Sequence, residues 1–165
     1  MITDIFLQEI TSCQKRVIKA DRKKMILENR HYKNNLYLTS EDEKYNFKIF
    51  LRKSDEFIED FSIGLMWTNP QDYIDVTKSI IMLRCQGPHD GKQELGFDIH
   101  HDFHTHEITA LDVEEKRYTK PSKRNSTDLF HSFDQALFYF IEKCGIINID
   151  DFIELSIDPN QTTLL

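Results

Sequence analysis

Residues 36–51 read LYLTSEDEKYNFKIFL, and this stretch contains the pattern that decides the fold. Apolar and polar residues alternate in both of its halves, and the polar residues 40–43 separate the halves. Successive side chains of a strand point to opposite faces, so the alternation predicts a β-hairpin with one buried face and one face in water. The apolar positions are Leu36 and Leu38, followed by Tyr45, Phe47, Ile49 and Leu51.

Three more strands are expected after the hairpin. Residues 61–67, FSIGLMW, and residues 80–85, IIMLRC, have strand composition, and Asn69-Pro70 breaks the chain between them. The second of these runs is so continuously apolar that it predicts a central position in the sheet. A further strand is expected from His104 to Leu111, which makes about five strands in all.

A helix is expected on each side of these strands. Apolar residues recur at steps of three and four from Ile2 to Ala20, which predicts a helix from about Thr3 to Ala20. The same spacing follows Ser132, where Ser132 and Gln135 form a capping-box pair and Gly145 supplies the stop. Helix, strands and helix in this order predict an α+β fold, with an antiparallel sheet and the C-terminal helix packed on one face.

Composition sets bounds on the class of protein. The 165 residues are 39% hydrophobic and include 12 Phe and 6 Tyr, so we expect one ordered domain over residues 1–165. The net charge of -7 is not typical of a general nucleic-acid binder. Without a CxxC pair, free buried thiols are expected at Cys13, Cys85 and Cys144. With no signal peptide and no apolar run of membrane-spanning length, a cytoplasmic protein is expected.

Histidines gather in one segment of the chain. Five of the seven lie between residues 89 and 106, and a strand through His104 and His106 would place both on one face. Antiparallel pairing of this strand with residues 80–85 would bring His89 or Arg84 close to them. The five are His89, His100, His101, His104 and His106.

Three interpretations of this segment remain open. Two imidazoles could exchange a proton with a phosphodiester without a metal, while Arg84 stabilises the developing negative charge, as in RNA cleavage through the 2′-hydroxyl. Alternatively, His104 and His106 could hold a divalent ion together with His89, His101 or Asp98. The cluster could also be structural, or bind a partner without any chemistry.

Basic residues form two strips in this acidic chain. The first comprises Lys15, Arg16, Lys19, Arg22, Lys23 and Lys24, and a solvated helix end explains it well. The second follows the histidine strand, where basic side chains beside an exposed aromatic residue could bind single-stranded RNA by phosphate contact and stacking. These candidate RNA-binding residues are Lys116, Arg117, Tyr118, Lys120, Lys123 and Arg124.

Several short motifs carry a family resemblance. A strand ending in Arg84, the turn Gly87-Pro88-His89, the strand His104-Thr105-His106 and a helix ending at Cys144-Gly145-Ile146 resemble those of an uncharacterised family of small bacterial proteins. The chain is similar, more distantly, to the TumE-type toxins of toxin–antitoxin systems. The similarity covers most of residues 30–147, although Asp90-Gly91-Lys92 replaces the family's usual Asn-Pro-Asp-Gly run after the histidine.

The resemblance and the residues together set the functional expectation. The resemblance carries over Arg84, His89, His104 and His106, and it implies a toxin-like or mobile-element accessory protein. The leading hypothesis is a metal-independent, cofactor-free enzyme that cleaves RNA with these four residues. The alternatives are a non-enzymatic protein that binds an antitoxin or a phage or host target, and a metal-dependent hydrolase.

Overall fold

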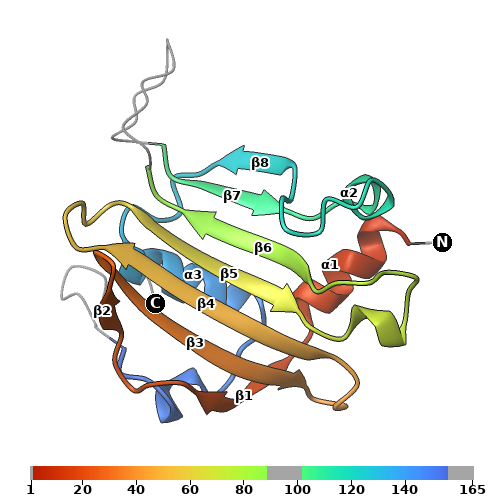
Figure 1. Ribbon diagram of the computed structural model, residues 1–165, viewed down its shortest axis with the longest axis horizontal. Coiled ribbons are helices and arrows are strands. Elements are labelled where there is room, and N and C mark those ends of the chain that lie inside the picture. Colours follow the sequence, from red (N-terminus) through yellow and green to blue (C-terminus); the bar gives the residue numbers. More distant parts are fainter. Residues whose placement is uncertain (1, 89–101, 156–165) are drawn as a thin grey trace.

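The computed structural model describes residues 2–88 and 102–155, which form an eight-stranded antiparallel sheet with helices packed on it (Figure 1). The strand order is β1-β3-β4-β5-β6-β7-β8, and β2 pairs with β3. The elements are α1 (Asp4–Ser12), β1 (Lys15–Ala20), β2 (Ile26–Glu28), β3 (His31–Ser40), β4 (Asn46–Ser54), β5 (Phe61–Trp67), η1 (Pro70–Asp72), β6 (Ile80–Gln86), β7 (His104–Glu107), α2 (Ala110–Glu114), β8 (Lys123–Ser126), α3 (Phe133–Lys143) and η3 (Ile149–Asp151).

The central hairpin confirms the alternation in the sequence. Leu36 of β3 lies opposite Ile49 of β4, Leu38 lies opposite Phe47, and all four side chains are buried. The runs 61–67 and 80–85 form β5 and β6, which continue the sheet in antiparallel order. The expected α+β fold is therefore present, with eight strands where the sequence predicts about five.

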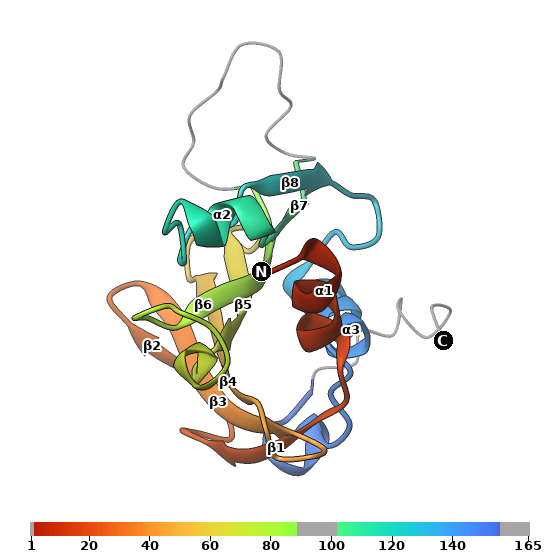
Figure 2. The same cartoon turned by 90° about the vertical axis from the view of Figure 1, so that its right-hand side faces the viewer.

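The core lies between one face of the sheet and the helices α1 and α3. Figure 2 shows the sheet curving around these two helices, which lie on its concave side. Leu7 and Ile10 of α1 and Ala136 and Phe140 of α3 are buried there, as the predicted helix periodicity requires. Ser132 caps α3 by accepting a hydrogen bond from the Gln135 amide.

The expected helix over residues 3–20 is wrong in its second half. The helix ends at Ser12, and residues 15–20 form β1, the edge strand beside β3. Val17 points into the core, whereas Ile18 lies at a bulge and is 57% exposed. The helical spacing of apolar residues therefore extends by coincidence into residues 15–20, which form a strand because they pair with the long strand β3.

Residues 104–126 also differ from the expectation. The strand that begins at His104 ends at Glu107, because Thr109 caps the N-terminus of α2 and forms a reciprocal capping box with Asp112. The second basic strip, which follows the histidine strand, ends in β8, which pairs with β7. All four side chains of β8 are polar and exposed, so no apolar pattern marks this strand in the sequence.

The edge of β1 is closed at Val17 by a side chain, next to Lys15, whose backbone bonds to Gly145 and Ile147. The Val17 amide donates to Asn148 Oδ1 at 2.6 Å, and Asn148 Nδ2 donates to the Val17 carbonyl at 3.2 Å. These two bonds reproduce the pairing that a neighbouring strand would make.

None of the helices within residues 2–88 and 102–155 combines the length and apolarity needed to cross a membrane.

Candidate nucleic-acid interface

The sheet face opposite α1 and α3, called the open face below, brings together several residues from different strands. Figure 1 looks onto this face, with α3 behind the sheet. The predicted pairing of the arginine strand with the histidine strand is confirmed, with Arg84 opposite His106 and Gln86 opposite His104. The row through Arg84 runs across six strands and comprises Asn35, Phe50, Gly64, Arg84, His106 and Arg124.

The charged residues at the strand positions of the open face are all basic, although Asp102 pairs with Arg124 and Asp21 bonds to Asn35 at the margins of this face. The strand positions of β3 to β8 that alternate onto this face hold no Asp or Glu, although the whole chain has a net charge of -7. A positive surface on an acidic protein attracts a polyanion to one side of the molecule. The basic residues at these positions are Lys33, Lys48, Arg52, Arg84 and Arg124.

Arg84 is the most unusual of these basic residues. Its side chain is half-buried, and its Nε is buried without a hydrogen-bond partner among the described residues. The guanidinium carbon lies 5.5 Å from the centre of the Phe50 ring, and burial lowers the pKa of Arg84 below its ordinary value. A half-buried cation without a carboxylate partner among the described residues is costly, so this position favours an anionic ligand.

Phe50 lies in contact with Arg84 because its cross-strand neighbour is a glycine. A Cβ atom on Gly64 would lie 1.9 Å from Phe50 Cζ, so the ring occupies the space above the glycine backbone. The ring is half-buried, which leaves part of its surface on the open face. An aromatic ring beside an arginine is a platform on which a nucleobase can stack.

The two described histidines have different environments. His104 is 2% exposed, and its Nδ1 lies 3.0 Å from the Asp102 carbonyl oxygen. Burial is the main cause that lowers the pKa of His104 to about 4, so its ring is neutral at neutral pH. His106 is half-buried, its Nδ1 lies 3.2 Å from the Pro121 carbonyl, and its ring centre is 5.0 Å from that of His104.

Three of the predicted histidines lie in the segment 89–101. His89, His100 and His101 lie outside the described residues, so their roles stay predictions. Within the described ranges, no group of three or more His, Cys, Asp or Glu side chains is arranged to hold a metal ion. Cys85 and Cys144 are buried free thiols as expected, and Cys13 is a free thiol that is partly buried.

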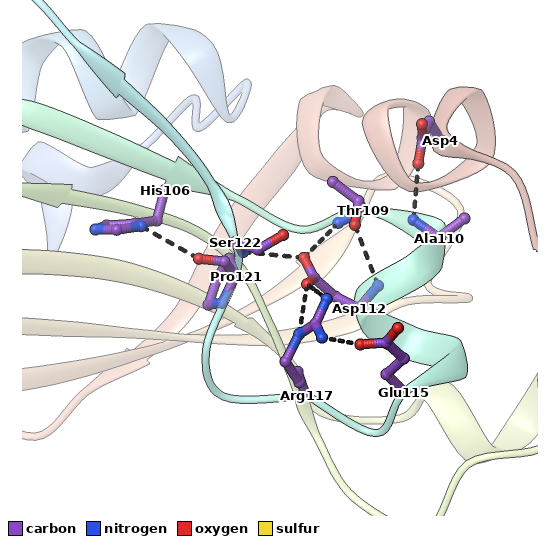
Figure 3. Close-up of polar contacts among 9 residues, drawn as sticks. All are labelled: Asp4, His106, Thr109, Ala110, Asp112, Glu115, Arg117, Pro121 and Ser122. Carbon is purple, nitrogen blue, oxygen red and sulfur yellow. Dashed lines mark hydrogen bonds and ion pairs between the residues drawn. The ribbon is translucent and has the colours of Figure 1, made fainter.

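Several side chains of the loop predicted to bind RNA form hydrogen bonds and ion pairs within the protein (Figure 3). Asp112 is fully buried and accepts hydrogen bonds from Arg117 at 2.9 and 3.0 Å and from the Ser122 amide at 3.0 Å. Burial would raise the pKa of Asp112, but these hydrogen bonds leave it below its ordinary value. Arg117 also pairs with Glu115, so its charge is already balanced.

The other residues of this loop divide between the two faces. The expected exposed aromatic residue is absent, because Tyr118 is 8% exposed. Lys123 lies 3.6 Å from Glu107, and Arg124 pairs with Asp102 although it reaches the open face beside His106. Lys116 and Lys120 are exposed and have no ion pair among the described residues.

The sequence interpretation missed the hairpin's contribution to this surface. Lys33, Lys48, Phe50 and Arg52 occupy the outward positions of the same alternation that predicts the hairpin. A check of the charges at these positions would have found the basic face. Comparison with models of protein families, with curated proteins and with solved structures finds no match to this chain.

Proposed function

We propose that this protein binds single-stranded RNA on the open face of its sheet. The observation that carries the proposal is Arg84, a half-buried guanidinium without a carboxylate partner among the described residues. A phosphate bound beside the guanidinium would supply the missing negative charge and accept a charge-assisted hydrogen bond from it. Arg84 is therefore the central phosphate contact.

The surroundings of Arg84 support a polymer rather than a single anion. Lys33, Lys48 and Arg52 lie on neighbouring strands of the same face, and no acidic residue interrupts the described strand positions between them. Basic side chains that follow a backbone and an aromatic ring that accepts a base are the common parts of single-strand binding surfaces. Phe50 supplies the ring.

The direct test compares Arg84→Gln with the wild type in fluorescence anisotropy of a labelled RNA strand across a salt series. We expect affinity about tenfold lower for the variant, because one charge-assisted hydrogen bond is lost. The slope of log affinity against log salt should fall by about 0.7, the value for one phosphate contact on a single strand.

The matched control is Lys143→Gln, which removes one positive charge from α3, on the opposite side of the sheet. It should keep the wild-type affinity and salt slope. Failure of the wild type to bind any single strand at low salt would overturn the proposal and favour the alternative, a protein that binds another protein. Equal losses in both variants would show attraction to total charge rather than a site.

RNA cleavage is a second candidate function, favoured by the position of His106 between Arg84 and Arg124 in the strand pairing. In cleavage through the 2′-hydroxyl, an imidazole removes the proton of the attacking oxygen and a guanidinium stabilises the charge on phosphorus. His106 suits the first role, whereas His104 is neutral and buried and supplies no proton at neutral pH.

The toxin-like role rests on the motif resemblance and on this second candidate. It is tested by induced expression of the wild type and of the His104→Ala/His106→Ala double mutant in bacteria, at equal soluble levels. Growth arrest by the wild type alone would support the role. Equal growth would remove it. The metal-dependent alternative requires stoichiometric metal in protein purified without a histidine tag, and loss of that metal in His104→Ala.

A further inference from the structure

A small depression lies beside Phe50, where β2, β3 and β4 meet. Its volume is about 210 Å³, enough for one planar base. The segment between β1 and β2, together with β2, forms one wall, and residues of β3 and β4 form the other. The lining residues used below are Asp21, Glu28, Lys33, Asn35, Phe50 and Arg52.

The two walls of the depression differ in charge. Lys33 and Arg52 are cross-strand partners and make one wall basic. The other wall holds Asp21, Glu28 and Arg22, and the Arg22 guanidinium lies 3.9 Å from the Glu28 carboxylate. Asp21 is therefore the lining carboxylate that has no ion pair among the described residues. Asp21 Oδ2 accepts a hydrogen bond from Asn35 Nδ2 at 3.1 Å, which positions the carboxylate beside β3.

This distribution of charge selects the chemistry of a ligand. A carboxylate accepts hydrogen bonds and repels a phosphate, so Asp21 suits a neutral group with donors. Among the nucleobases, guanine presents two adjacent donors, N1–H and the 2-amino group, which match the two oxygens of a carboxylate. Adenine and cytosine place an acceptor beside their amino group, and uracil places its one donor between two acceptors.

We infer that the depression binds a guanine base of the RNA strand. Asp21 accepts hydrogen bonds from its N1–H and 2-amino groups, and Phe50 stacks on the base. Lys33 and Arg52 contact the neighbouring phosphates, and Arg84 lies on the same face in the adjacent cross-strand row. The inference rests on the proposed function and adds to it a preference for single-stranded RNA that contains guanosine.

The test uses short oligouridines that carry one central guanosine, inosine, adenosine, cytidine or uridine. In fluorescence anisotropy, the wild type should bind the guanosine strand about tenfold more tightly than the all-uridine strand, as expected for one two-donor contact to a base. Inosine lacks the 2-amino group, so it should lose most of this preference. Adenosine and cytidine should bind like uridine.

Asp21→Asn separates recognition from general attraction. This variant should bind the guanosine strand as weakly as the all-uridine strand, while its affinity for the all-uridine strand stays equal or rises because a negative charge is gone. Asp55→Asn removes an exposed acidic charge that does not line the depression, so it should keep the guanosine preference.

Failure of this inference is distinguishable from failure of the proposed function. Equal wild-type affinities for all five strands, or a guanosine preference that persists in Asp21→Asn, would overturn the guanine site. If Arg84→Gln still weakened binding of every strand, the proposed function would stand without the guanine site. No binding of any strand by the wild type would remove both.

Discussion

The Nζ atom of Lys15 lies 2.8 Å from the carbonyl oxygen of Cys144, and this contact joins the first strand to the end of α3. Lys15 is completely buried, and it also donates to the carbonyls of Thr11 and Cys13 at 2.7 Å each. Carbonyls at the end of a helix lack partners within the helix. One ammonium group therefore satisfies the C-terminal ends of both α1 and α3.

Replacing this lysine should destabilise the protein. Lys15→Met retains an apolar side chain of similar length but leaves three buried carbonyls without a donor, so we expect a loss of about 3 kcal/mol in the free energy of unfolding. Chemical denaturation measures it. Lys24→Met, at an exposed lysine, should change stability by less than about 0.5 kcal/mol. Similar small losses in both variants would contradict the assigned role of Lys15.

His104 should make stability depend on pH between its two pKa values. The pKa of His104 is about 4 in the folded protein and 6.5 as an ordinary value, because burial disfavours the charged ring. The unfolded chain therefore binds a proton in this interval that the folded chain does not. Stability should fall as pH drops from 6.5 toward 4, by about 2 kcal/mol from this group.

His104→Gln should flatten this part of the pH dependence, as measured by urea denaturation across the same interval. His131→Gln, which changes an exposed histidine, serves as the control and should follow the wild-type curve. Parallel curves for the wild type and His104→Gln would show that His104 is not the group responsible.

Gly64→Ala should displace the Phe50 ring. The added methyl group would overlap Phe50 Cζ, and we expect a loss of about 2 kcal/mol because the ring must move off the glycine. In a Phe50→Leu background the shorter side chain leaves more room, so the same change should cost about half as much or less. Denaturation of the four proteins gives the coupling energy, and simple additivity would exclude the contact.

The two histidines of β7 should differ if RNA is cleaved. His106→Ala should abolish cleavage by removing the base, whereas His104→Gln should retain most of the activity because a buried neutral ring is not needed for proton transfer. Gel analysis of a labelled RNA, with protein purified to remove contaminating nucleases, measures both. If both variants lost cleavage activity equally while keeping equal stability, His104 would have to be counted among the catalytic residues.

The sequence predicts the part of the fold that depends on local pattern. The hairpin, β5, β6 and α3 each have a clear apolar period, and the structure has all four. The sequence pattern did not show that α1 ends before Lys15 and that β1 begins there. Lys15 is buried because its ammonium group bonds to carbonyls at the ends of α1 and α3, and hydrophobic periodicity carries no information about such bonds. β8 has no apolar residue and exists through its pairing with β7.

The candidate site was likewise predictable only where it depends on local sequence pattern. Strand spacing places Arg84 near His106, because the pairing of β6 with β7 follows from the sequence. Spacing gives the face that a side chain occupies but not what covers it, so the burial of His104 was not foreseen. The capping-box spacing of Thr109 and Asp112 could have indicated the start of α2. It does not indicate that Arg117 and the Ser122 amide also bond to Asp112.

The side-chain amide of Asn148 affects whether another polypeptide can add a strand to this sheet. Because it occupies the Val17 amide and carbonyl, an incoming peptide cannot pair with the edge of β1 at this point as an added strand. At the other edge, β8 exposes Lys123 and Arg124, whose charges oppose pairing with a second copy of itself. The sheet is therefore protected against β-augmentation at Val17 of one margin and along β8 of the other.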